Sequence, residues 1–225
     1  MTTTLPPEPP ERRAFAYFDA QNLFNAAKEA FSEFEGYDEP TYDPLKIAEY
    51  VCRIQSWRLD KVHLYTGIPE QSDRRHAWWN RKLQVLGSRG VETFARPLRY
   101  REQQILLRNG TSSYGRVGRE KGIDVRLALD MVRHALESRY DVALVFSQDQ
   151  DLSEAVKDIT LIGQQQGRWI KVASAFPVGA SKRGPDGFER NERGINGTKV
   201  VKIPKAAYDA CIDPLDYSRP LTPGR

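Results

Sequence analysis

The sequence predicts an α/β fold with a doubly wound, mostly parallel five-stranded sheet, helices on both faces and an inserted basic β-hairpin. Three observations predict it. Short apolar runs alternate with amphipathic stretches between residues 14 and 175, which is typical of strands joined by helical crossovers. Acidic residues follow several of these runs, at the strand ends where parallel sheets collect functional groups. Residues 96–121 interrupt this rhythm with a basic stretch around a turn signal.

The first half of the chain is expected to form three strands and three helices. Residues 14–19 are an almost unbroken apolar run, as in a strand buried on both faces. Pro44 begins a helical pattern, as proline often does at the first helical position. Further on, Trp78, Leu83 and Leu86 share an apolar face that Gly90 ends. The expected strands are 14–19, 62–66 and 91–95, and the expected helices are 23–34, 44–54 and 73–90.

The second half begins with the hairpin and then returns to alternating strands and helices. Asn109-Gly110 lies between two short extended runs, which is a strong signal for a hairpin turn. Leu127, Met131 and Ala135 are spaced to face the core from one side of a helix. The expected helices are 123–138 and 152–165, and the expected strands are 142–146 and 169–175. Residues 198–203 are a candidate edge strand, and 204–211 a candidate short helix that begins with proline.

A single domain is expected over residues 13–212, since 225 residues with 40% hydrophobic content can bury a sizeable core. The proline-rich residues 1–12 are expected to be a disordered lead and 213–225 a loose tail. Residues 177–197 hold five glycines and two prolines without periodicity. Such a stretch predicts a long loop at the rim of the sheet, as a lid, a binding loop or a disordered segment.

Composition argues against several classes of protein. No stretch approaches the ~20 apolar residues of a membrane span, and no signal for export is visible. Cys52 and Cys211 give neither a zinc spacing nor a disulfide framework. The histidines, His63, His76 and His134, form no zinc or catalytic spacing either. A cytoplasmic protein without a membrane partner is therefore expected.

The net charge of +4 is modest, but its distribution is uneven. Residues 96–121 hold seven basic and two acidic residues, a net charge of +5. Because arginine forks suit phosphates and aromatic rings can stack on unpaired bases, this segment is interpreted as an RNA contact with Tyr100 and Tyr114 as stacking faces. An ordinary edge that arginines protect from pairing with other chains is the alternative. The basic residues are Arg96, Arg99, Arg101, Arg108, Arg116, Arg119 and Lys121.

Four acidic residues at expected strand or helix ends indicate a metal site. They are Asp19, Asp124, Asp149 and Asp151. Like charges about 4 Å apart near a protein surface repel by roughly 4 kcal/mol per pair, so converging carboxylates need a bound cation or raised pKa values. An oxygen ligand set without cysteine or histidine favours Mg²⁺ or Mn²⁺. The alternatives are that Asp19 only caps a helix and that Asp149 and Asp151 form a solvated turn.

Three motifs in this order resemble those of the NYN domains, including LabA-like proteins, in the PIN-like nuclease superfamily. The motifs are Asp19-Ala-Gln-Asn22-Leu23, Lys121-Gly122-Ile123-Asp124 and Ser147-Gln148-Asp149-Gln150-Asp151-Leu152. The resemblance covers roughly residues 14–175. The sequence departs from the family pattern at Gln148, where glycine is usual, and at Leu152, where phenylalanine is usual. Both departures affect the local turn more than the carboxylates.

The resemblance implies a metal-dependent endoribonuclease, and two-metal chemistry on carboxylates agrees with it. Asp19, Asp124, Asp149 and Asp151 are then metal ligands, directly or through water, with a water on the metal as nucleophile. Asn22 would bind the scissile phosphate or a ligand water, or else cap a helix. Ser147 would hold the turn, and Lys121 would contact phosphate.

The partners implied are RNA and a second copy of the chain or another protein. Asp130 is expected to be structural, since Arg126 and His134 lie four residues away on either side of it. The alternative function is a catalytically silent RNA-binding or assembly subunit of a larger complex.

Overall fold

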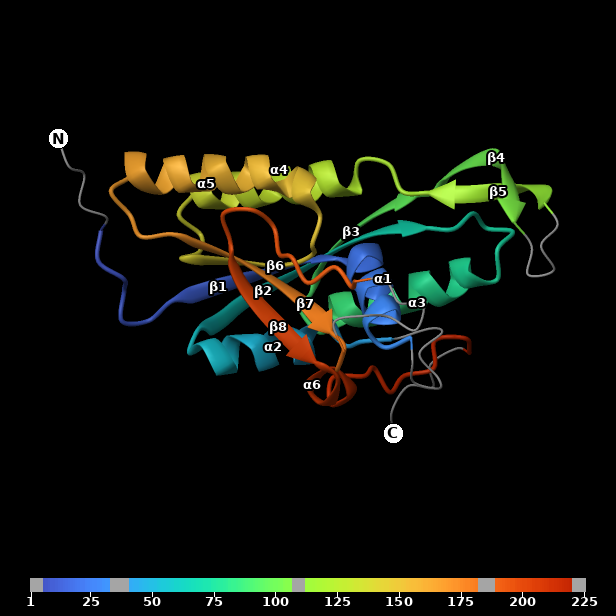
Figure 1. Cartoon of the computed structure of the whole chain (residues 1–225), viewed down its shortest axis with the longest axis horizontal. Helices are drawn as coiled ribbons and strands as arrows, with labels where there is room; N and C mark the ends of the chain where they lie inside the picture. The colour runs from blue at the N-terminus through green and yellow to red at the C-terminus, as the bar shows by residue number, and fades with distance from the viewer. Residues whose placement is uncertain (1–5, 33–40, 107–111, 182–188, 220–225) are drawn as a thin grey trace.

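The structure is a computed structural model of the chain, and it describes residues 6–32, 41–106, 112–181 and 189–219. Its centre is a parallel sheet in the order β3-β2-β1-β6-β7-β8 (Figure 1). The strands are β1 (Arg13–Asp19), β2 (Arg58–Ile68), β3 (Glu92–Pro97), β6 (Val142–Phe146), β7 (Lys171–Val178) and β8 (Lys199–Pro204). The helices are α1 (Ala20–Ala30), α2 (Pro44–Gln55), α3 (Arg75–Ser88), α4 (Ile123–Leu136), α5 (Ser153–Gln165) and α6 (Lys205–Asp209), with a 3₁₀ turn, η1 (Gln150–Leu152).

The sheet has six strands, so the predicted count of five was wrong by one. The sixth is the candidate edge strand, β8, which pairs in parallel with β7 from Ala173 opposite Lys199 to Val178 opposite Pro204. Its burial alternates, with Val201 and Ile203 inside and lysines outside. Only one face of β8 is covered, which explains why its apolar signal is weaker than that of the inner strands.

Helices cover both faces of the sheet, as predicted (Figure 1). Successive side chains of a strand point to opposite faces, and β1 shows this alternation. Ala16 and Phe18 pack into the core on the side of α1, α2 and α3. Phe15 and Tyr17 pack into the core on the side of α4 and α5. These four side chains are at most 5% exposed, so the middle of the sheet is rigid support for whatever lies at its ends.

The basic segment between β3 and α4 forms a separate two-stranded antiparallel sheet, as the hairpin signal predicts. Strand β4 (Arg99–Leu106) pairs with β5 (Ser112–Arg119), from Arg99 opposite Arg119 to Leu106 opposite Ser112. The hairpin extends from the body of the molecule beside the end of β3 (Figure 1). The Asn109-Gly110 turn and Arg108 lie outside the described residues.

The end of the chain packs against α3, which differs from the loose tail expected after residue 212. Tyr217 is fully buried, and its hydroxyl donates a 2.9 Å hydrogen bond to Asp213. Asp213 is also paired with the buried Lys82 at 3.2 Å, while Arg81 donates to the carbonyl of Tyr217. These contacts tie the chain down as far as Tyr217, close to residue 219, the last one described. The sequence did not predict these contacts, because each depends on a single side chain in a segment that has no helical or strand periodicity.

The lead before β1 has no helix or strand over residues 6–12. The backbone N–H of Arg58 donates to the carbonyl of Arg12 at 2.9 Å, next to the first rung of the β1–β2 ladder. Residues 1–5 lie outside the described part. Within the described part of the chain, no helix is both long enough and apolar enough to cross a membrane.

Candidate metal and RNA site

Asp19 ends β1 and caps α1. Its Oδ1 accepts a 3.0 Å hydrogen bond from the backbone N–H of Asn22, and the residue is only 7% exposed. The helix therefore begins at Ala20, three residues earlier than predicted, and Asn22 is not the cap. Instead, Asn22 Oδ1 accepts a 3.0 Å bond from the backbone N–H of Gln148. This bond joins the end of β1 to the end of β6, which places two of the predicted motifs side by side.

The turn after β6 presents Asp149. Ser147 is buried, and its Oγ accepts the backbone N–H of Asp149 at 3.1 Å. Asp149 Oδ1 in turn accepts the N–H of Asp151 at 3.0 Å. That bond uses the backbone of Asp151; its side chain is exposed, and among the described residues it forms no ion pair or hydrogen bond within the site. Ser147 thus holds the turn as expected, while Asp151 stays at its outer edge.

A third carboxylate, Asp124, lies in the first turn of α4. Gly122 caps that helix in the left-handed region at φ 72°, a conformation that glycine adopts without strain. The backbone conformation at the start of α4 therefore explains why the Lys121-Gly122-Ile123-Asp124 motif has a glycine at this position. Lys121, just before it, is exposed.

Glu120 is a carboxylate that the sequence analysis did not assign to the site. It leaves the end of β5 and accepts a short hydrogen bond from the backbone N–H of Gly67, at the end of β2. A Cβ at position 67 would collide with Glu120 and with Leu98, so glycine is required for this approach. Glu120 directly precedes the Lys121-Gly122 motif, and this position could have indicated a role in the site. The positive charge of the surrounding segment obscured that signal.

The pKa values show how these carboxylates influence one another. Burial raises the pKa of Asp19 to about 6, the N–H of Asn22 opposes this, and the charges of Asp149 and Asp124 raise it further. Burial raises the pKa of Glu120 to about 7, and the charges of Asp19 and Asp124 add to the shift. The structure therefore brings four carboxylates into one electrostatic group, which we call the carboxylate cluster: Asp19, Glu120, Asp124 and Asp149.

The donor set of the carboxylate cluster fits a hydrated divalent cation. Among the described residues, no lysine, arginine or histidine forms an ion pair with these four carboxylates. Nor do the described residues contain three or more His, Cys, Asp or Glu side chains placed to hold one metal ion together. Mg²⁺ keeps several waters and binds proteins through one or two carboxylates plus substrate phosphates, so the absence of a closed three-ligand cage among the described residues is compatible with this ion.

Asp130 lies apart from the cluster, on the buried side of α4. It accepts hydrogen bonds from the hydroxyl of Tyr65 at 3.0 Å and from Arg126 at 2.9 Å, and it pairs with Arg133 at 2.9 Å. The predicted structural role of Asp130, with Arg126 as a partner, is confirmed. His134, the other candidate partner, instead contacts the hydroxyl of Tyr17.

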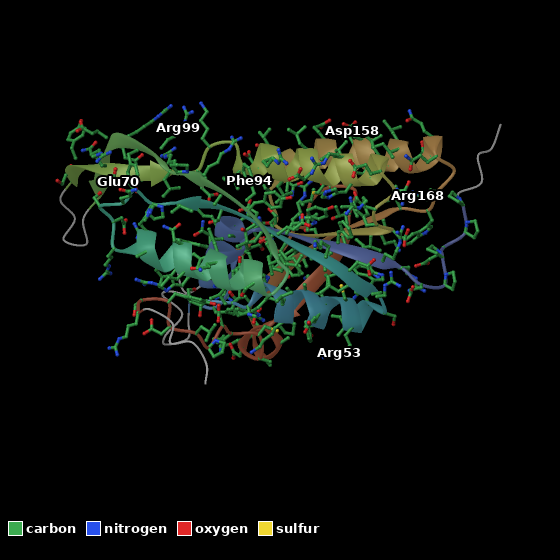
Figure 2. All side chains as sticks on the ribbon, turned by 180° about the vertical axis from the view of Figure 1, so that it is seen from behind. Arg53, Glu70, Phe94, Arg99, Asp158 and Arg168 are labelled. Atoms are coloured by element: carbon green, nitrogen blue, oxygen red, sulfur yellow. The ribbon has the colours of Figure 1, made fainter. Side chains whose placement is uncertain are left out.

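The predicted RNA-contact residues are distributed along one arm of the molecule. Arg99, Arg101 and Arg119 are exposed on the hairpin, with Arg119 donating to Gln103. Figure 2 shows Arg99 and Glu70 at one end of the molecule and Arg168 towards the other. Arg96 lies nearer the cluster, with its guanidinium over Phe94 and close to Gly122.

Two of the predicted contact residues have structural partners. Arg116 pairs with Glu70 at 3.1 Å and lies over the ring of Tyr100. The Tyr100 hydroxyl accepts the backbone N–H of Glu70, so this ring ties the hairpin to the end of β2. Tyr114, in contrast, is 78% exposed. Of the two predicted stacking faces, Tyr114 is the accessible one.

The loop after β7 returns to the site through glutamines. Gln148 Nε2 donates to the carbonyls of Asn191 and Arg193 at 2.7 and 3.1 Å. Gln150 Nε2 donates to the carbonyl of Gly194 at 3.0 Å and its Oε1 accepts the N–H of Asn196. Gln148, where the family usually has glycine, therefore holds the glycine-rich loop against the turn that carries Asp149.

Comparison with known proteins agrees with this geometry. The chain matches the family model of the NYN domain over residues 13–183, which is most of its length. The chain therefore belongs to the NYN domain family, whose members are PIN-like nucleases and typically use divalent metal ions. A comparison with curated proteins finds no match.

Several solved chains are similar to this one, among them the following two. One is a protein of unknown function, VPA0982, from Vibrio parahaemolyticus RIMD 2210633, with a TM-score of 0.49 and 19% identity over 88% of this chain and 96% of that one. The other is ribokinase from Giardia lamblia, with a TM-score of 0.31 and 8% identity over 74% of this chain and 48% of that one. Neither likeness carries an argument about function.

Proposed function

We propose that this protein is an endoribonuclease that uses Mg²⁺ or Mn²⁺ to hydrolyse RNA phosphodiester bonds by a two-metal mechanism. The observation that carries the proposal is the carboxylate cluster at the carboxyl end of the sheet. Two of its members have raised pKa values, and no described cation neutralises them. Such a cluster is unfavourable unless a cation or a proton joins it.

Three of the four residues of the carboxylate cluster are assigned as metal ligands in this proposal. Asp19, Asp124 and Asp149 would hold the divalent ions directly or through water. A bound divalent ion supplies electrostatic stabilisation of the phosphate oxygens and lowers the pKa of water. Asn22 and Ser147 position the acids by fixing the turn after β6 to the end of β1. Asp151, at the outer edge of the turn, would reach an ion only through water.

The basic arm supports RNA as the substrate. Arg99, Arg101 and Arg119 are exposed on one face of the hairpin, and the exposed Lys121 follows shortly after the end of β5. Such cationic side chains bind phosphates independently of base sequence. The chain would then hold the RNA backbone along the hairpin and direct it to the carboxylate cluster.

The test is metal-dependent cleavage of a mixed pool of structured and single-stranded RNA with Mn²⁺, with Mg²⁺ and with EDTA. Asp149→Asn is expected to reduce the cleavage rate on the order of 100-fold or more, since it removes a charge that the ions require. Asp158→Asn is the matched control, because Asp158 is an exposed acid on α5 (Figure 2). It should cleave at the wild-type rate.

A second candidate is a silent RNA-binding or assembly subunit, and the wide spacing of the carboxylates favours it, since no three of the described ones are placed to bind one ion. Under this alternative, RNA stays intact in every lane, and Asp149→Asn binds RNA at least as tightly as the wild type because it has lost a negative charge. Cleavage that requires metal and disappears in Asp149→Asn would exclude this alternative.

A further inference from the structure

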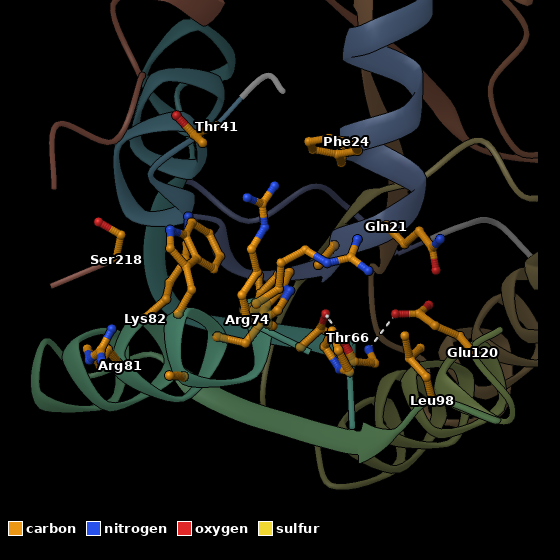
Figure 3. Close-up of a pocket in the computed structure, with 18 of the residues that line it drawn as sticks. Gln21, Phe24, Thr41, Thr66, Arg74, Arg81, Lys82, Leu98, Glu120 and Ser218 are labelled. Carbon is orange, nitrogen blue, oxygen red and sulfur yellow. Dashed lines mark hydrogen bonds between the residues drawn. The ribbon is translucent and has the colours of Figure 1, made fainter. Parts of the chain in front are cut away.

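A pocket of about 620 Å³ opens directly beside the carboxylate cluster (Figure 3). On one side it is lined by Gln21, which follows the Asp19 cap closely, by Gly67 at the end of β2 and by Glu120 of the cluster. On the other side it is lined by helix α3. Its volume lies within the roughly 300–1,000 Å³ of small-ligand sites. Because Glu120 belongs to both, a group in this pocket would lie next to a group at the cluster.

Aromatic side chains from two different helices line the pocket. Phe24 of α1 is partly exposed and belongs to neither core cluster of the described residues. Trp78 of α3 is held edge-on against Trp79 and Tyr217, at centroid distances of 5.2 and 5.4 Å. Rings that are fixed or only partly buried offer flat faces on which a base can stack, whatever its sequence.

Within the described residues, two of the pocket's four basic side chains, Arg74 and Arg81, form no ion pair. Lys82 pairs with Asp213 and Arg75 with Asp73, while Arg81 donates a hydrogen bond to the carbonyl of Tyr217. For Arg74, the described residues provide no ion pair. Figure 3 shows Arg74 in the middle of the pocket, between Lys82 and Glu120. A guanidinium in this position suits a phosphate.

We infer that this pocket binds one unpaired nucleotide of the RNA, next to the bond that is cut, with its base against Phe24 and its phosphate on Arg74. The inference rests on the proposed function and adds its substrate class. A base within a duplex is stacked and paired on its neighbours and cannot enter a pocket without being extruded, at a cost. The pocket therefore selects single-stranded RNA or an unpaired loop over a duplex.

The test separates binding from cleavage. Binding is measured by fluorescence anisotropy in EDTA with a labelled short single-stranded RNA, with the same strand annealed to its complement, and with AMP as a free mononucleotide. The proteins are the wild type, Phe24→Leu, Phe24→Ala and Arg74→Ala. Arg53→Ala is the matched control, because Arg53 is an exposed arginine near the end of α2 (Figure 2) and does not line the pocket. Phe24→Leu keeps an apolar side chain and removes only the flat ring.

The expected result is a loss of roughly 10-fold in affinity for the single strand in each pocket variant, with Arg53→Ala unchanged and the duplex bound more weakly by the wild type. Variants that bind the single strand as well as the wild type does would overturn the pocket, even if the wild type cleaves RNA. Loss of affinity without any cleavage by the wild type in Mn²⁺ would overturn the nuclease and leave the pocket standing. AMP that binds as tightly as the RNA would overturn the assignment to an RNA chain.

Discussion

Glu120 shows at the residue scale how a site can be hidden by its surroundings. In the sequence it is one of two negative charges in a basic segment. In the structure it turns inward to Gly67 and joins Asp19 and Asp124 electrostatically. Its pKa of about 7 lies above the usual 4.5, so its ionised form is disfavoured in the folded state. Its cost to stability is present above pH 7 and absent below pH 4.5.

Glu120→Gln should therefore stabilise the metal-free protein at pH 8 and change it little at pH 5. Gln can still accept the N–H of Gly67, and it removes only the charge. A rise in Tm on the order of 5 °C is expected at pH 8, measured by thermal unfolding in EDTA. Asp158→Asn, an exposed acid, should leave Tm unchanged at both pH values. Equal Tm values for Glu120→Gln and the wild type at pH 8 would contradict the burial of this charge.

Other site residues were predictable because each belongs to a motif beside the end of a predicted strand or the start of a predicted helix. Asp19, Asp124 and Asp149 follow this rule, and the structure brings all three together. Asp151 belongs to the same motif as Asp149 but not to the carboxylate cluster. One turn of the chain can direct two neighbouring carboxylates in different directions. Spacing identifies which acids could meet. It does not fix the direction of each side chain.

At the scale of elements, the glycine-rich loop is held to the turn after β6 by side-chain amides. Gln148→Ala removes the two hydrogen bonds from Nε2 to the carbonyls of Asn191 and Arg193. We expect amide exchange of residues 190–196 to speed up by roughly 10-fold, while the global stability falls by about 1–2 kcal/mol at most. Hydrogen exchange followed by mass spectrometry measures both. Unchanged protection of this segment would mean that Gln150 alone holds the loop.

The hairpin makes a separate prediction about salt. Arg99 and Arg101 are exposed, so replacing both by alanine should leave the fold intact and weaken RNA binding. If both contact phosphates, the slope of log affinity against log salt should fall by about 1.4 for single-stranded RNA. Arg53→Ala serves as the control for a lost surface charge. A slope equal to that of the wild type would favour the alternative in which arginines only protect an exposed edge.

The elements themselves were largely predictable, with boundaries as the main error. The inner strands are apolar runs, and apolar runs are visible in a sequence. Strand β8 was seen only as a candidate because one of its faces is solvated. The pocket was not predictable, since its residues come from α1, α3, the end of β2 and the C-terminal segment, which only the folded chain brings together.

At the scale of the whole molecule, metal binding should stabilise the fold. A cation that binds only the folded state stabilises it by an amount that grows with the logarithm of its concentration above Kd, and it competes with protons for the carboxylates. Millimolar Mn²⁺ or Mg²⁺ should therefore raise Tm by a few degrees at pH 8 and by less at pH 5.5. Differential scanning calorimetry checks this, with Asp19→Asn as the variant that should lose the effect. The same rise in Asp19→Asn would place the ion elsewhere.

The position of β1 in the sheet has a consequence for synthesis of the protein. It lies between β2 and β6, and Arg13 bonds Asp141, 128 residues later in the chain. On the ribosome, β1 emerges well before β6 and must wait for synthesis of the intervening chain before its second neighbour exists. At roughly 5–20 residues per second, that interval lasts on the order of ten seconds. During this interval, one edge of an apolar strand is open to other nascent chains. The nascent protein should therefore depend most on chaperones when the ribosome stalls before β6 has been made.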